Sequence, residues 1–118
     1  MDLNHIHLHV ASVERAAAFY ARCFGLREHV WHGDILFMRD DAGMDLALAP
    51  GGAAAMPDWF HVGFRLAARD EVTALFERFK SDGVDIRGAL EELDDFAVFR
   101  CADPDGYLLE VYWEPQPA

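Results

Sequence analysis

Three histidines alternate with apolar residues near the start of the sequence. His5, His7 and His9 have the period-two spacing of a strand, so they share one face, and the apolar residues between them share the other. The apolar face is expected to pack on a helix, which leaves three imidazoles on the opposite face. Imidazoles bind metal ions and transfer protons near neutral pH. We therefore take His5 as a candidate metal ligand and His7 and His9 as candidate catalytic proton-transfer residues, although polar residues on an open strand face are also common.

His61 and Glu110 are the chemistry-bearing residues of the second half. The two halves of the chain are similar when His5 is aligned with His61 and, with a slightly larger shift near the ends, Ala47 with Glu110. A pseudo-two-fold axis between the halves then brings together two imidazoles, one carboxylate and an alanine that cannot bind a metal. Two His and one carboxylate hold Fe(II) or a similar divalent ion and leave coordination positions open. The alternatives are a hydrogen-bonded core histidine at position 61 and a solvated edge-strand carboxylate at position 110.

The first half has the pattern of a βαβββ module that positions the first three histidines. Ser12 is placed as a helix N-cap, an apolar stripe follows at helical spacing, and Gly25 is placed to end the helix. The four expected strands are residues 4–10, 28–31, 35–38 and 44–49.

A Gly-, Ala- and Pro-rich stretch over residues 50–57 precedes a second copy of the pattern. The second helix is indicated by a stripe from Val72 to Phe79 and ends at Gly83. The sequence thus predicts an α+β fold: one domain of two tandem βαβββ modules, residues 1–50 and 58–118, with curved mixed sheets around a metal-binding cleft. The strands expected in the second module are residues 60–66, 84–87, 96–101 and 107–113.

Composition limits the classes of partner. The 118 residues include 10 Lys and Arg against 21 Asp and Glu, for a formal charge of −11. Such a chain repels phosphate backbones and anionic lipids, so we expect neither a nucleic-acid nor a membrane partner. The sequence shows neither an apolar run long enough to span a bilayer nor a signal-peptide pattern, and its two cysteines lack a CxxC spacing. A cytoplasmic location is therefore expected.

Three segments resemble one family. LNHIHLHVASVERAAAFYARCFGL, FHVGFRL and the closing CADPDGYLLEVYWEP are similar to the vicinal oxygen chelate superfamily, which includes glyoxalase I, extradiol dioxygenases, fosfomycin-resistance transferases and bleomycin-binding proteins. The resemblance implies metal ligands at His5, His61 and Glu110. It implies a divalent ion, Fe(II) or Mn(II) by preference and Zn(II), Ni(II) or Co(II) as alternatives. A fourth family ligand, Glu in glyoxalase I, falls on Ala47, which argues against a true glyoxalase I.

The resemblance also assigns a position to Arg100. An acid/base Tyr of extradiol dioxygenases falls on this residue, so Arg100 is a candidate catalytic residue that holds an anionic oxygen, or else a surface strand residue. The basic cluster of fosfomycin enzymes has no obvious counterpart. Single-chain members of the superfamily usually form homodimers in which the active sites are shared between subunits, and the same is expected here.

The predicted function is a divalent-metal-dependent enzyme acting on a small molecule that chelates the ion through vicinal oxygens, of dioxygenase type. A glyoxalase-like lyase or isomerase is the nearest alternative. The alternative from another class is a metal-free, bleomycin-resistance-type protein that binds a cationic drug between aromatic side chains. The aromatic residues in question, which also suit core or dimer contacts, are Trp31, Trp59, Phe96, Tyr112 and Trp113.

Overall fold

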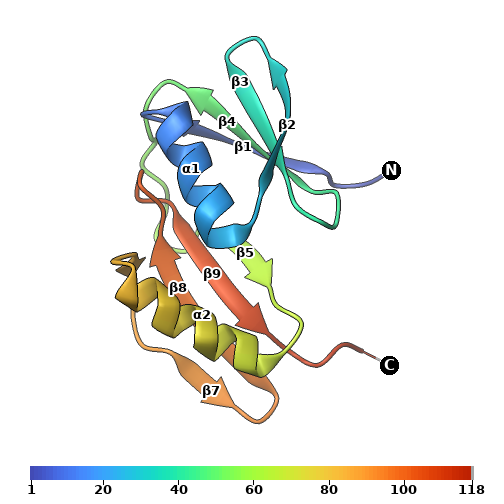
Figure 1. Ribbon diagram of the computed structural model, residues 1–118, viewed down its shortest axis with the longest axis vertical. Coiled ribbons are helices and arrows are strands. Elements are labelled where there is room, and N and C mark those ends of the chain that lie inside the picture. Colours follow the sequence, from blue (N-terminus) through green and yellow to red (C-terminus); the bar gives the residue numbers. More distant parts are fainter. Residues whose placement is uncertain (118) are drawn as a thin grey trace. The chain divides into compact units, whose positions relative to one another are not determined.

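The computed structural model describes residues 1–117, which form two compact units (Figure 1). The first unit is Met1–Ala55 and the second begins at Met56. The boundary falls inside the Gly-, Ala- and Pro-rich stretch that the sequence singles out.

The first unit is a four-stranded mixed sheet with one helix. The strand order is β1-β4-β3-β2; β1 and β4 are parallel, and the other two pairs are antiparallel. A β-bulge between Glu28 and Val30 interrupts the pairing of β2 with β3. The elements are β1 (His5–Val10), α1 (Val13–Phe24), β2 (Arg27–His32), β3 (Ile35–Arg39) and β4 (Asp45–Pro50).

Helix α1 begins and ends at the residues that the sequence indicates. The Ser12 side chain accepts a hydrogen bond from the Arg15 amide, and Gly25 adopts a left-handed conformation with φ 68°. On β1, Leu8 and Val10 are buried while His5, His7 and His9 are exposed. The apolar side of the strand therefore packs into the core, as its period predicts.

The second unit repeats this plan with one additional strand. Its sheet has the order β5-β9-β8-β6, and β7 also pairs with β8. Strands β5 and β9 are parallel and the other pairs are antiparallel. The elements are β5 (Val62–Arg65), α2 (Arg69–Ser81), β6 (Asp85–Ile86), β7 (Glu91–Leu93), β8 (Phe96–Ala102) and β9 (Leu108–Trp113).

Two strand predictions in this unit need correction. The strand expected over residues 60–66 spans only Val62–Arg65, because the Phe60 amide bonds to the Pro57 carbonyl in a turn and His61 thus precedes the ladder. Strand β7 was not predicted, because its three residues are all exposed and show no alternation of buried and exposed positions.

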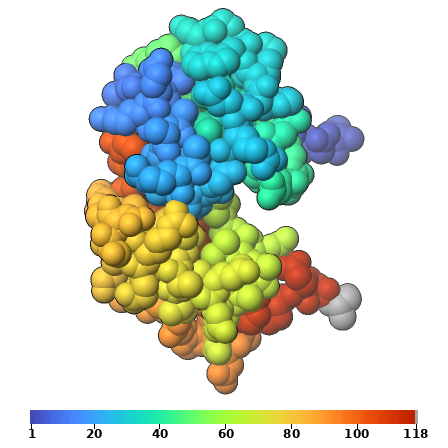
Figure 2. Space-filling view, viewed as in Figure 1, coloured from blue at the N-terminus to red at the C-terminus, as the bar shows by residue number. Residues whose placement is uncertain are grey.

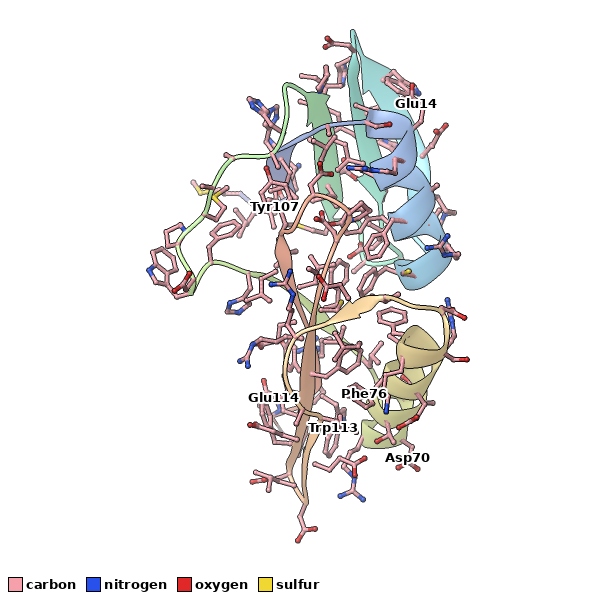
Figure 3. The ribbon with its side chains drawn as sticks, turned by 90° about the vertical axis from the view of Figure 1, so that its left-hand side faces the viewer. Glu14, Asp70, Phe76, Tyr107, Trp113 and Glu114 are labelled. Atoms are coloured by element: carbon pink, nitrogen blue, oxygen red, sulfur yellow. The ribbon has the colours of Figure 1, made fainter. Side chains whose placement is uncertain are left out.

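Helix α2 packs on one face of the second sheet. The ring of Phe99 on β8 lies 5.3 Å from that of Phe76 and 5.8 Å from that of Phe79. Figure 3 shows Phe76 between the helix and the strands, and Asp70 on the outer side of the helix. In the view of Figure 2, α2 covers this side of the unit. Within the described residues of this unit, no helix packs on the other face of the second sheet, and we call it the open face of that sheet.

The pairing registers of the two sheets correspond residue by residue. His7 lies opposite Ala47 in the first sheet, and Gly63 lies opposite Glu110 in the second. His7 is two residues after His5, and Gly63 is two residues after His61, so His5 corresponds to His61 and Ala47 to Glu110. The similarity of the two halves seen in the sequence is therefore present in the hydrogen-bonded ladders.

Both cysteines, Cys23 and Cys101, are buried free thiols. Among residues 1–117, neither helix has the length and apolar character needed to cross a bilayer.

Candidate metal centre

The second unit brings His61 and Glu110 together on its open face. His61 immediately precedes β5, and Glu110 is on β9, the strand parallel to it. The Nε2 atom of His61 lies 3.6 Å from the Oε2 atom of Glu110. The carboxylate side chain is 17 % exposed and the imidazole 40 %, so the pair is reachable from solvent.

The donor chemistry of this pair fits a divalent cation. The Nδ1 atom of His61 lies 3.0 Å from the Trp59 carbonyl oxygen, so in the neutral ring Nδ1 carries the proton and donates to that oxygen. The lone pair of Nε2 then faces Glu110, as in metal-binding histidines whose other ring nitrogen donates to a carbonyl oxygen. Two ligands of one ion at about 2.0–2.2 Å lie roughly 3.0–3.6 Å apart, depending on the coordination geometry, and the observed separation falls at the upper end of that range.

Arg100 is the third charged group of this site. It lies directly across from Glu110 in the β8–β9 ladder. Its Nε and Nη2 atoms donate to Oε2 of Glu110 at 3.1 and 2.9 Å. The guanidinium therefore orients the carboxylate and offsets its charge, and it does so on the same oxygen that faces His61.

His5 lies in the first unit, at the start of β1. Its Nδ1 atom is 2.8 Å from the side-chain oxygen of Asn4, so Nδ1 donates there in the neutral ring and Nε2 is left as the acceptor. His5 thus has the same tautomer preference as His61. Within residues 1–117, no three His, Cys, Asp or Glu side chains gather closely enough to hold a metal ion, so the pair in the second unit is what the structure shows directly.

His7 and His9 also lie on β1, on the face that carries His5. Their ring centroids are 5.1 Å apart with an interplanar angle of 66°. His7 is opposite Ala47 and His9 is opposite Ala49, so both imidazoles stand beside small side chains. Phe37 of β3 borders this row, because its ring lies 5.8 Å from that of His5.

Asp45 is the only carboxylate of β4, and it is engaged in an ion pair. It lies opposite His5, but its two oxygens accept hydrogen bonds from Arg39 at 2.7 and 3.0 Å. These bonds hold the pKa of the Asp45 carboxyl below its usual value, and burial opposes them. The register places Ala47, and not Asp45, at the position equivalent to Glu110. Asp45 therefore does not supply the carboxylate that a glyoxalase I would need there.

A cavity of about 390 Å³ lies elsewhere in the first unit, between α1 and strands β2 and β3. Trp31, Leu36 and Met38 line it together with alanines of the helix. These residues are on the helix side of the sheet, since they alternate with Phe37, which borders the histidines. The cavity therefore lies on the opposite side of the first sheet from the histidine row.

A family model, described as Glyoxalase/Bleomycin resistance protein/Dioxygenase superfamily, matches residues 2–111. The chain belongs to this superfamily, which confirms the resemblance and the fold class found in the sequence. Among curated proteins, the chain is similar to a manganese-dependent 2,3-dihydroxybiphenyl 1,2-dioxygenase of Geobacillus genomosp. 3, with 28 % identity over 116 residues. That match covers 94 % of this chain and 36 % of the dioxygenase, so the chain spans about a third of its relative's length.

Solved structures share the fold over nearly the full length of the chain. A possible glyoxalase from Bacillus cereus is 31 % identical, with a TM-score of 0.82, and the match covers 94 % of this chain and 97 % of that one. The fosfomycin resistance protein FosX from Listeria monocytogenes, in a complex with Mn(II) and sulfate, is 23 % identical, with a TM-score of 0.82. The match covers 97 % of this chain and 90 % of FosX, and at this identity it shows the fold alone.

Sequence reasoning missed the groups that orient the candidate ligands. The Trp59 carbonyl and the Asn4 side chain each hold an imidazole, and neither produces a periodic signal. The proximity of Asn4 to His5 in the chain was the one available hint.

Proposed function

We propose that this protein is an enzyme that uses a divalent metal ion held by His5, His61 and Glu110. The observation that carries the proposal is the geometry of His61 and Glu110, whose donor atoms face each other across 3.6 Å. The equivalence of His5 with His61 in the two ladders supports His5 as the proposed third ligand. The similarity to a manganese-dependent dioxygenase favours Mn(II) or Fe(II). Imidazole and carboxylate ligands also bind Zn(II), Ni(II) and Co(II), which are the alternatives.

The chain's own residues have distinct roles in this proposal. The ion, when bound, supplies Lewis-acid stabilisation of negative charge on substrate oxygens. Arg100 orients Glu110 and offers its remaining N–H groups to an anionic oxygen beside it. His7 and His9 are the proton-transfer residues, because both are exposed imidazoles on the face that carries His5.

The proposed substrate is a small molecule with two neighbouring oxygens, and the proposed reaction is of dioxygenase type. Two imidazoles and one carboxylate leave room for a bidentate substrate and a further small ligand. A lyase or isomerase of the glyoxalase kind is the second candidate. It is disfavoured because Ala47 provides no fourth ligand or base and Asp45 is occupied by Arg39.

The metal-free drug-binding alternative is less consistent with the sheets. It needs aromatic side chains on one surface. Trp31 and Trp113, however, each lie on the face of their sheet that packs against a helix. Tyr112 and Phe96 are on the open face of the second sheet. Trp59 is 75 % exposed in the segment before β5.

A homodimer with shared sites is the proposed assembly, and the cytoplasm is the proposed location. In such a dimer, His5 of one subunit joins His61 and Glu110 of the other. The two buried free thiols suit a reducing compartment.

Metal analysis of purified variants tests the proposal. His61→Ala and Glu110→Gln are expected to weaken Mn(II) binding at least tenfold, since each removes a ligand, and His5→Ala is expected to do the same. His32→Ala is the matched control, because His32 is an exposed histidine of β2 that contacts Phe37 and is no ligand in the proposal. Full metal content in folded His61→Ala and Glu110→Gln proteins contradicts the metal centre. Oxygen consumption with catechols, measured on the Mn(II)- and Fe(II)-loaded protein, then separates dioxygenase from lyase chemistry.

A further inference from the structure

Gly63 leaves a gap in the open face of the second sheet, directly beside Glu110. The two residues are partners in the β5–β9 ladder, and Gly63 is exposed. A Cβ atom at this position has only one neighbour within 4 Å, the Cε1 atom of Tyr112 at 3.7 Å. The backbone of Gly63 has no positive φ, so no turn or strain explains the glycine. The gap therefore provides space next to the carboxylate of the candidate metal centre.

Arg65 stands on the far side of this gap. It is two residues beyond Gly63 on β5, opposite Tyr112 on β9, so its side chain emerges on the same open face. The rise of a parallel strand, about 3.3 Å per residue, puts its backbone roughly 6–7 Å from the row of Gly63 and Glu110. The Arg65 side chain therefore leaves the strand two residues along from the row of Gly63 and Glu110, on the same open face.

Arg65 differs from the other two arginines beside this face in having no counter-charge. Arg100 is held by Glu110, and Arg87 pairs with Asp85 at 2.8 Å. Within residues 1–117, no carboxylate lies within ion-pair distance of Arg65, which is exposed. An unpaired cation is notable in a chain whose acidic residues outnumber its basic residues 21 to 10.

We propose that Arg65 binds a carboxylate of the substrate, with Gly63 making room for the part of the molecule that joins this carboxylate to the vicinal oxygens. This inference rests on the proposed function and narrows its substrate class to vicinal-oxygen compounds that also carry a carboxylate. The planar guanidinium fork matches a carboxylate through two parallel hydrogen bonds. Arg65 acts in binding and specificity, and the bond-breaking chemistry takes place at the other end of the molecule.

Two probes that differ in charge test the inference by calorimetry on Mn(II)-loaded protein. 3,4-Dihydroxyphenylacetate carries both the vicinal oxygens and the carboxylate, and 4-ethylcatechol lacks the carboxylate. Arg65→Gln is expected to raise the Kd of the first probe about tenfold or more and to leave the Kd of the second within twofold. Arg65→Lys is expected to retain part of the affinity, because it keeps the charge and loses the fork.

Arg22→Gln is the matched control, since it removes the same charge from the last turn of α1, in the other unit. It is expected to change neither affinity. Equal weakening of both probes by Arg65→Gln, or no weakening of either, overturns the inference. Failure of 3,4-dihydroxyphenylacetate to bind the wild-type protein also overturns it. If Mn(II) content is then still lost in His61→Ala, the proposed metal centre stands without the carboxylate site.

A second variant tests the gap itself. Gly63→Val is expected to fold, because the position is an exposed strand residue whose added Cβ meets Tyr112 only at ordinary contact distance. It fills the space between Glu110 and Arg65, so the Kd of both probes is expected to rise at least tenfold while Mn(II) content stays at the wild-type level. Unchanged affinity for both probes in the folded variant contradicts the role given to Gly63.

Discussion

Asp45 is the clearest case in this protein of a side chain whose position is fixed by an ion pair. It is 7 % exposed, it lies on the histidine-bearing face of the first sheet, and Arg39 donates to both of its oxygens. Its pKa is lowered, first by the Arg39 hydrogen bonds and then by the charges of Arg39, His29 and His5. Asp45 is thus a structural carboxylate next to a candidate metal ligand.

Asp45→Asn is expected to destabilise the protein by about 1–3 kcal/mol at pH 7, because charge-assisted hydrogen bonds to a buried group are lost. A carboxyl whose folded-state pKa is lowered stabilises the fold above its unfolded-state pKa of about 3.9, and this contribution is lost as the pH falls through the folded-state pKa. The difference in unfolding free energy between wild type and variant should therefore be full at pH 7 and shrink below about pH 4. Urea titrations at several pH values measure it, and a pH-independent difference contradicts the ion-pair explanation.

The residue types at the candidate site were predictable from the sequence, whereas their partners were not. Strand parity and the alignment of the two halves put His61 and Glu110 at one site, and the structure places their donor atoms 3.6 Å apart. Arg100 was predicted to lie near that face, but its two hydrogen bonds to Glu110 depend on cross-strand register, which the sequence does not state. Arg65 carries no signal in the sequence, because its lack of an ion pair appears only in the structure.

At the scale of elements, the two helices differ in how they begin. Helix α1 has Ser12 as a side-chain cap, whereas α2 starts from Ala68, which has an extended backbone and no side-chain cap. The first turn of the helix therefore has a side-chain cap in the first unit and none in the second. Helix α1 was predictable because cap, stripe and terminal glycine agree, and α2 was predictable from its stripe and the glycine that follows it. The strand predicted over residues 84–87 contains β6, whereas β7 was not predicted, because its three exposed residues have no pattern of their own.

This difference predicts opposite effects of two serine and alanine exchanges. Ser12→Ala is expected to lower the unfolding free energy by about 1 kcal/mol, because the Arg15 amide loses its acceptor. Ala68→Ser is expected to raise it by a similar amount, because a hydroxyl becomes available to the uncapped first turn of α2. Denaturant unfolding measures both. A stabilising Ser12→Ala or a destabilising Ala68→Ser contradicts the assignment of these caps.

At the scale of the whole molecule, the chain consists of two copies of one arrangement of strands and helix. At one equivalent position the second copy carries a carboxylate and the first copy carries an alanine. Ala47 is fully buried and corresponds to Glu110. The repeat was readable from the sequence because both copies keep the same order of histidine, helix and closing strand. A third ligand for the pair was not readable in the same way, because periodicity describes one module at a time.

Ala47→Glu tests this correspondence. A glutamate at a buried position costs stability unless a cation compensates its charge. We therefore expect a lower melting temperature in the metal-free variant and a larger rise on adding Mn(II) than the wild type shows, since a ligand that binds the folded state stabilises it. Ala49→Glu is the matched control, because Ala49 is also buried on β4 and lies on the same face, opposite His9. Equal responses of the two variants to Mn(II) contradict the equivalence of Ala47 and Glu110.

The parallel pairing of β5 with β9 has a consequence for biosynthesis. These strands are the first and the last of their unit; His61 immediately precedes β5, and Glu110 lies on β9. A polypeptide emerging from the ribosome exposes His61 long before its counterpart has been translated. Metal capture by the pair must then wait until the final strand has left the exit tunnel, so a stalled nascent chain that stops short of β9 remains unable to chelate through these two groups.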